Sequence, residues 1–547
     1  MKSHLVHISN RQIVYLVLIA LLLVPLTLIS RPSSGVGKNE GGQLAQLRAK
    51  YTLGDANIGQ IDPRSSVIRF VSVGLEGIAS LILWVQADEY KEKEDWTSYE
   101  AVLDNLIKLQ PYYPVVWEHQ AWNYSYNISA EFDDYHQRYD WIIKGISFLQ
   151  QGTNYLQDNP RLLQRTGWFV SHKIGRADER IHYRRLFRED DTFHALQPFQ
   201  ERDNWLFGRN YYRMADDAVD NRGVRLTYMD PVLFHSNAIR AQMFAAEALA
   251  TDYLVNLEAQ ADRPGTPAER AERVAEIDEA YTQQSRGRWS VADHELREFS
   301  QRSFAADDGT IYRLGEWEPE QAILKQKVAK LDALAPTLRK EIREGRFASL
   351  TLAEKESFRV DPTLRSEEQA RLAEEAEAKL FVSDQDLAAN VPDPKRAEAV
   401  ELAKQTAAHE QKLDRIASSR KLIELDYWIS RCELEQNPDA SEAYKHFAHG
   451  LAAYKVDTDL ITAKRELEAG FANWRKVLDQ FPMMLKDQTA YTTLDVVQKY
   501  RQVLKQLDEP FPDKFILQDL LVAHREEEEN TTSASDQGER APRPGNR

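Results

Sequence analysis

An internal offset of 34 residues, early in the chain, constrains the fold more than any other feature. Two successive segments between Leu83 and Pro160 match at this offset through the pairs Leu83/Trp117, Gln86/Gln120, Ala87/Ala121 and Tyr90/Tyr124. In each segment a large residue is followed four positions later by a small one, and three positions after that by an aromatic one. This spacing places all three on one side of a helix. The small residue lets two helices approach closely, and the large residues fill the space around that contact.

The same stretch predicts how each helix pair ends. Pro111 follows Ala87 by 24 residues, and a proline ends a helix because it has no N–H to continue the ladder. Large, small, aromatic and late proline positions together form the tetratricopeptide (TPR) pattern. A third unit requires an insertion, because Gly167 lies 46 residues after Ala121, and the extra residues fit the turn at Ser129 to Tyr135. An irregular helical bundle with chance spacing is the alternative.

Length and composition limit the class of protein. The chain has 547 residues, which is too many for one core, so two or three helical regions are expected. The net charge of −16 argues against nucleic-acid binding, since phosphate contacts need concentrated Lys and Arg. Cys432 is the only cysteine, which excludes an internal disulfide and a Cys-rich metal cluster. We expect no cofactor.

An apolar run near the N-terminus predicts a membrane anchor. Ile13–Ser30 contains 18 residues without a charge, close to the length that crosses a bilayer. A cleavable signal peptide is the alternative, but the residues after the run fit a cleavage site poorly. We therefore expect a single-pass protein of the cell (inner) membrane, with residues 1–12 cytoplasmic, residues 13–30 transmembrane and the bulk of the chain extracytoplasmic.

A second apolar segment, Val67–Val85, permits two interpretations. Its Val, Ile, Leu and Phe residues favour membrane insertion, but the central Glu76 opposes it, which makes insertion marginal. We expect the segment to be the buried first helix of the repeat domain. A second membrane span, which would return the body to the cytoplasm, is the alternative.

Composition divides the remaining chain. We predict a linker (31–62), a TPR-like helical domain (63–255), a charged helical or coiled-coil-like region (256–425), a C-terminal helical region (426–522) and a disordered acidic tail (523–547). One short β-hairpin is expected to turn at Asp308-Gly309. The predicted fold class is therefore all-α: a transmembrane helix, then a TPR-like α-solenoid or bundle with a long charged helical insert and at most one hairpin.

Known catalytic and nucleotide-binding motifs are missing from the sequence. It has no G-x-x-x-x-G-K-[ST], G-x-G-x-x-G, H-E-x-x-H or G-x-S-x-G pattern. His446 and His449 lie three apart on a predicted helix and could share a metal, but no third ligand is evident. We expect no metal site, and we do not expect an enzyme.

One constellation of polar and aromatic residues suggests a binding groove. Its members are Trp117, His119, Gln120, Trp122, Asn123, Tyr126 and Asn127, and the more distant His172 and Lys173 are expected to border the same groove. Asn123 and Asn127 share a helix face, and aromatic rings with amide donors suit a peptide or another extended ligand. The alternative is structural: Trp117 and Trp122 in the core, and amides that satisfy buried backbone groups.

Several stretches carry a family resemblance: WVQADEYKEKEDWTSYEAVLDNLIKLQPYYPVVWEHQAWNYSYN, RLLQRTGWFVSHKIGRADE, DPVLFHSNA, LDYWISRCELEQ and FANWRKVLDQFP. The chain resembles, over most of residues 40–520, a family of uncharacterised bacterial proteins best represented in planctomycetes. Members similarly begin with one apolar segment, and some carry an iron-responsive-element label. The resemblance supplies no catalytic residues.

These observations together predict a membrane-anchored helical-repeat scaffold for protein–protein interaction. Its expected partners are other proteins, themselves membrane-associated; nucleic acid is not expected, and the oligomeric state is open. Two other functions stay open: an enzyme with an unrecognised site in the His119–Asn127 groove, and an iron-linked regulatory protein on the family label alone.

Overall fold

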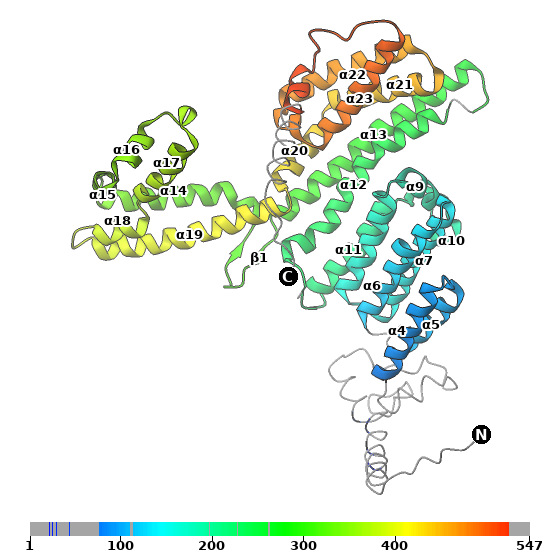
Figure 1. Ribbon diagram of the computed structural model, residues 1–547, viewed down its shortest axis with the longest axis horizontal. Helices are drawn as coiled ribbons and strands as arrows, with labels where there is room; N and C mark the ends of the chain where they lie inside the picture. The colour runs from blue at the N-terminus through cyan, green and yellow to red at the C-terminus, as the bar shows by residue number, and fades with distance from the viewer. Residues whose placement is uncertain are drawn as a thin grey trace, which may run out of the picture. The chain divides into compact units, whose positions relative to one another are not determined.

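A computed structural model of the chain describes residues 76–109, 113–195, 197–226, 228–260 and 263–524, together with single positions 21, 25, 29 and 43. Within these residues the fold is all-α apart from one two-stranded sheet, as predicted (Figure 1). The chain separates into two compact units. The first holds the described residues up to Asp230 and Asn237–Ala245; the second holds Pro231–Ser236 and the described residues from Ala246 onward.

The first unit is built from helices that follow one another along the chain. They are α4 (Glu76–Glu92), α5 (Trp96–Leu109), α6 (Pro114–Trp122), α7 (Tyr135–Tyr155), α8 (Pro160–Trp168), α9 (Arg180–Glu189), α10 (Asp191–His194) and α11 (Asn204–Asp220). Short π-helical segments extend two of them, η2 (Asn123–Ile128) after α6 and η4 (Phe169–Lys173) after α8. The short 3-10 segments are η3 (Ser129–Glu131) and η5 (Phe199–Glu201).

Local sequence explains where these helices begin. Pro114 and Pro160 occupy first-turn positions of α6 and α8, where a missing N–H costs nothing. The Asn159 side chain caps α8 by accepting from the Leu162 N–H at 3.0 Å. Asp203 caps α11 in the same way through the N–H groups of Trp205 and Leu206. The insertion expected at Ser129 to Tyr135 corresponds to η3 and the turn before α7.

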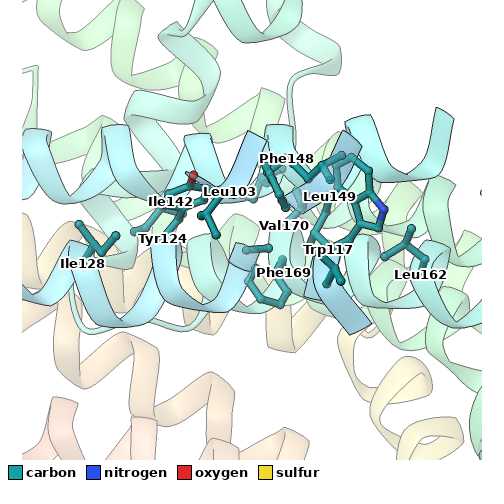
Figure 2. Packing of buried hydrophobic residues seen from close by; sticks show 14 of the residues in the cluster. Leu103, Trp117, Tyr124, Ile128, Ile142, Phe148, Leu149, Leu162, Phe169 and Val170 are labelled. Atoms are coloured by element: carbon teal, nitrogen blue, oxygen red, sulfur yellow. The ribbon is translucent and has the colours of Figure 1, made fainter. Parts of the chain in front are cut away.

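The small residues of the 34-residue offset lie at close helix contacts. Ala87 and Ala121 are 1% and 0% exposed. A Cβ added at Gly145 on α7 would lie 2.8 Å from the Ala121 carbonyl oxygen, so α6 and α7 approach as closely as a glycine allows. The fully buried Trp117 packs beside Phe148, with ring centroids 4.9 Å apart, in the core drawn in Figure 2.

Gly167 marks a second close approach. A Cβ added there would lie 2.8 Å from the Gly208 carbonyl oxygen, which brings α8 against α11. The two large residues beside it, Leu163 and Val170, are both 0% exposed. The residue that the longer offset identifies therefore occupies a contact of the same kind as Ala121. Pro111, which was expected to end the unit, lies outside the described residues.

The first described helix is only partly buried. α4 buries Ala87 and packs Leu83, Trp84 and Tyr90 against the core. Four apolar side chains on its other side remain exposed, Ile78, Leu81, Ile82 and Val85. Across the described residues no helix has both the length and the apolar character to span a bilayer. The predicted anchor Ile13–Ser30, except positions 21, 25 and 29, and residues 67–75 lie outside the described residues.

The second unit contains the longest of the described helices. Its principal helices are α12 (Pro231–Glu258, shared with the first unit), α13 (Pro267–Ser300), α14 (Trp317–Leu334), α19 (Arg396–Leu422), α20 (Leu425–Glu435), α21 (Pro438–Ala452), α22 (Leu460–Gln480) and α23 (Gln488–Gln506). Four shorter helices are α15 (Leu338–Ser349), α16 (Leu352–Arg359), α17 (Glu367–Leu380) and α18 (Asp384–Asn390). The short segments are η6 (Leu314–Glu316), η7 (Pro362–Leu364), the π-helical η8 (Ala453–Asp457) and η9 (Pro482–Lys486).

The charged region forms a helical arm. α14 and α19 lie side by side, and α15 to α18 gather at their far end (Figure 1). Ion pairs join the two long helices: Glu320 accepts from Lys412 at 2.6 Å and lies 2.8 Å from the His409 ring. Strands β1 (Phe304–Ala305) and β2 (Ile311–Tyr312) flank the Asp308-Gly309 turn, and Gly309 has a φ of +82°. This is the one hairpin that the sequence predicts.

The observed division of the chain differs from the predicted one at residue 255. That boundary falls inside α12, which is a single helix through Glu258. The charged region and the C-terminal helices belong to one unit because Leu249 and Tyr253 of α12 share an apolar cluster with Tyr281 of α13 and Ala448 of α21. The predicted linker 31–62, except position 43, and the tail beyond His524 lie outside the described residues.

Candidate functional site

Four rings in the first unit form a stacked row, here called the aromatic ribbon: Trp122, Tyr126, Trp168 and His172. Trp122 stacks on Tyr126 with ring centroids 4.0 Å apart, and both stack on Trp168 at 6.3 and 6.2 Å. Trp168 in turn stacks on His172 at 5.2 Å. Trp122 is 43% exposed and the other three are half-buried, so one side of the row faces solvent.

The spacing of the chain produces this row. Trp122 and Tyr126 lie four residues apart at the junction of α6 and η2, and Trp168 and His172 lie four apart at the junction of α8 and η4. Residues at this spacing share a helix face. Both junctions therefore present a pair of rings, and each junction opens into a π-helical segment, a conformation that is frequent at functional sites.

A network of buried amide groups lies at the junction of α6 and η2, next to two of the ribbon residues along the chain. The Asn123 side-chain amide, 4% exposed, donates to the Tyr99 hydroxyl at 2.9 Å and to the Gln120 side-chain oxygen at 3.1 Å. Tyr99 donates to the same Gln120 oxygen at 2.6 Å. The half-buried Asn127 donates to the Asn123 oxygen at 2.6 Å. These bonds hold the helix end in place, which fixes the neighbouring rings.

Cations line the ribbon. Lys173 Nζ lies 4.1 Å from the centre of the Tyr126 ring, and the Arg165 guanidinium lies 5.7 Å from that of Trp168. Beyond His172, the guanidinium of Arg176 lies 4.1 Å from the centre of the Phe244 ring. A cation over the face of an aromatic ring is attracted by the ring quadrupole. The surface therefore combines apolar ring faces with positive charge.

Burial changes the ionisation of the ribbon. It lowers the pKa of His172 to about 4, with a further contribution from the charge of Arg176, so His172 is neutral at physiological pH. Burial also lowers the pKa of Lys173 from its ordinary value and raises that of Tyr126 to about 12. A neutral imidazole can stack and accept a hydrogen bond, whereas Lys173 supplies the charge.

The predicted site residues separate into two groups. Trp117 lies in the core and Asn123 in the amide network, so neither contributes to the surface. Tyr126 and His172 belong to the ribbon. Asn127 and the exposed His119 contact the amide network: Asn127 donates to the Asn123 oxygen, and His119 is 3.2 Å from the Asn123 amide nitrogen, its ring meeting Trp84 edge-on at 5.2 Å.

The structure adds two residues to the predicted set, Trp168 and Arg165; Trp122 and Lys173, which the sequence had suggested, lie in and beside the ribbon. A signal for Trp168 was present in the sequence. Trp168 follows Trp122 by 46 residues and His172 follows Tyr126 by 46, the same offset that relates Ala121 to Gly167. Extending that offset to neighbouring residues identifies the whole ribbon. Arg165 carries no comparable signal, since only the folded chain brings it over the Trp168 ring.

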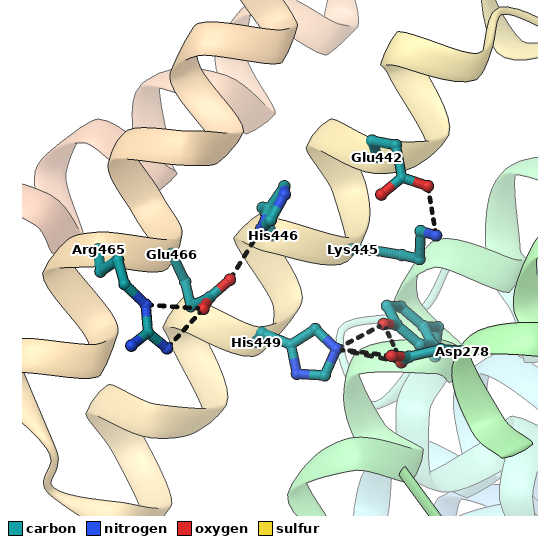
Figure 3. A network of polar contacts seen from close by, with 8 residues as sticks. Asp278, Glu442, Lys445, His446, His449, Arg465 and Glu466 are labelled. Carbon is teal, nitrogen blue, oxygen red and sulfur yellow. Dashed lines mark hydrogen bonds and ion pairs between the residues drawn. The ribbon is translucent and has the colours of Figure 1, made fainter. Parts of the chain in front are cut away.

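Each histidine of the pair considered as a metal site contacts a different carboxylate. His446 lies 2.8 Å from Glu466 of α22, and His449 lies 3.0 Å from Asp278 of α13 (Figure 3). The Tyr253 hydroxyl donates to the same Asp278 at 2.6 Å. Within the described residues no three His, Cys, Asp or Glu side chains are grouped so that they could hold a metal ion. The iron-linked interpretation therefore stays a prediction from the resemblance.

No protein-family model, curated protein or solved structure matches this chain. The resemblance to planctomycete proteins consequently stays a prediction as well. The function proposed below therefore follows from the all-α fold and the geometry of the aromatic ribbon.

Proposed function

We propose that this protein is a membrane-anchored scaffold of TPR-like helix pairs whose aromatic ribbon binds a partner protein associated with the membrane. The observation that carries the proposal is the solvent-facing stack of Trp122, Tyr126 and Trp168. Trp, Tyr and Arg dominate the binding energy of protein interfaces. Stacked helical repeats also present extended surfaces of this kind. An exposed tryptophan beside two half-buried rings favours a surface that a partner covers.

The anchor is supported by the uncharged run Ile13–Ser30 and by the poor cleavage site after it. Anchoring restricts the protein to a surface, and that increases its encounter rate with partners on the same membrane. The full-length protein should therefore remain in membranes after washing at high pH. Recovery as a soluble protein with a new N-terminus near Ser33 would contradict the anchor.

Topology has its own test. A tag after Arg547 should be digested by protease added to spheroplasts, because the body is proposed to lie outside the cytoplasm. Protection of the tag until the membrane is permeabilised would place the body inside. This experiment tests the side of the membrane only, and the binding role of the ribbon is tested separately below.

Site-specific cross-linking tests the binding surface. A photoreactive amino acid replaces Trp122 in the full-length protein in cells, and a parallel variant carries it at Ile461, which is 74% exposed in the second unit. We expect discrete protein adducts from position 122 and none of the same mass from position 461. Circular dichroism must show that both variants retain their helices. Identical adduct patterns from the two positions would refute the assignment of the surface.

A further inference from the structure

Lys173, at the edge of the ribbon, forms no ion pair within the described residues, and Glu179 acts on it only at longer range. Its Nζ lies over the Tyr126 ring, and among the described residues no hydrogen bond or ion pair reaches it. Burial nevertheless removes much of its water, as the lowered pKa reflects. Partly desolvated charges in folded proteins are usually paired. This ammonium group therefore has binding capacity that the described chain does not use.

Two carboxylates near the ribbon cations are each held by an arginine outside the ribbon. Glu118 receives two hydrogen bonds from Arg161, at 2.7 and 2.9 Å, and lies 3.7 Å from Arg165. Glu179 is paired with Arg138. These acids keep their present partners, so Lys173 has no carboxylate in direct contact at the edge of the ribbon.

We infer that the ribbon binds an acidic, extended segment of the partner protein, with one carboxylate beside Lys173 and an apolar or aromatic side chain against Trp122 and Trp168. This inference rests on the proposed function and names the chemistry of the partner. A carboxylate at Nζ would form a charge-assisted hydrogen bond in a partly desolvated setting, where such bonds are strong. The ring faces accept flat or apolar side chains, and Arg165 and Arg176 extend the positive edge.

Peptide selection tests this chemistry with random sequences in place of the partner. A phage-displayed library of random dodecapeptides is selected on the full-length protein in detergent, and in parallel on the Lys173→Met variant. Methionine keeps most of the length of lysine and removes its charge. Lys340→Met is the control, because Lys340 is 80% exposed on α15 in the second unit. Circular dichroism confirms that each variant is folded.

The inference predicts that enriched peptides carry Asp or Glu close to Trp, Phe or Pro. A synthetic copy should bind about tenfold or more weakly to Lys173→Met, since a hydrogen bond to a charged group contributes about 1.5–3 kcal/mol. Lys173→Arg should retain binding, Lys340→Met should leave it unchanged, and added salt should weaken it.

Enrichment of neutral or basic peptides, or equal affinity for Lys173→Met, would overturn the inference. If adducts still form at position 122 in that case, the scaffold function stands and only the partner chemistry is wrong. Failure of both the selection and the cross-linking would remove the proposed function too. Loss of binding to anionic lipid vesicles on Lys173→Met, without any acidic peptide motif, would assign the cation to lipid headgroups and would equally overturn the inference.

Discussion

Gly145→Ala is the most direct test of the close contact between α6 and α7. The added Cβ would lie 2.1 Å from the Ser125 hydroxyl oxygen, 2.8 Å from the Ala121 carbonyl oxygen and 3.3 Å from Tyr124 Cβ. The serine side chain can rotate away. The carbonyl oxygen belongs to the backbone of a buried helix and cannot move without moving the helix. The two helices must therefore separate.

The magnitude follows from two opposing contributions. Replacing a helical glycine with alanine stabilises an unobstructed helix by about 0.5–1 kcal/mol. Overpacking a well-packed contact costs about 1–3 kcal/mol, and a contact with backbone belongs to the upper part of that range. We therefore expect Gly145→Ala to destabilise the protein by about 1–2 kcal/mol. Gly287→Ala is the matched control: it lies inside α13 with no atom within 4 Å of the new Cβ.

Hydrogen exchange followed by mass spectrometry is the suitable assay, because it measures local opening of each helix in a chain with two units. Gly145→Ala should increase exchange in peptides from α6 and α7. Gly287→Ala should leave those peptides unchanged and slow exchange in α13. If Gly145→Ala slows exchange in α7 as Gly287→Ala slows it in α13, the close approach of α6 and α7 is wrong. The role of Ala121 as the small residue of that contact would then be wrong too.

Three further predictions concern buried polar groups. Burial raises the pKa of the Cys432 thiol to about 12, so the native protein should not react with Ellman's reagent at neutral pH, whereas the denatured chain should react fully; prompt reaction of the native protein would contradict this burial. The hydrogen bond to Asp278 raises the pKa of His449 above 6.5; stability from this pair is therefore fully present below pH 6.5 and is lost as the pH rises through the folded-state pKa. Urea unfolding of the full chain between about pH 5 and pH 9 should show that loss, and Asp278→Asn should abolish it. Asn123→Ala should destabilise α6 by about 1–3 kcal/mol in the same exchange assay, because the Asn127 amide loses its acceptor; an unchanged protein would show that water replaces the bond.

The burial of Cys432 limits its use as a probe of the side of the membrane on which the body lies. A lone cysteine is an obvious target for an impermeant thiol reagent when the side of a membrane is to be determined. Because Cys432 is 0% exposed in the described structure, the absence of labelling would report burial and not the side of the membrane. The tag after Arg547 is therefore the informative probe.

Helix contacts could be predicted from the sequence because helix packing needs small and large residues at regular spacings along the chain. The offset that relates Ala87 to Ala121 identifies residues that must be small, and both are buried at helix contacts. Prolines and capping side chains similarly determine where helices such as α8 begin. The all-α class and the single hairpin follow from signals of this kind, which act over a few residues.

The boundary of the units and the composition of the surface were decided by tertiary contacts. Residues near 255 do not show that this end of α12 belongs to the second unit, since the cluster of Tyr253 with Tyr281 and Ala448 depends on partners far along the chain. Lys173 likewise meets Tyr126 only because α6 and α8 stack. The spacing of Asn123 along its helix is compatible with a groove. Its amide is nevertheless buried, because it donates a hydrogen bond to Tyr99, 24 residues earlier in the chain. Side chains at one helix position can face solvent or core, and the neighbouring helix determines which.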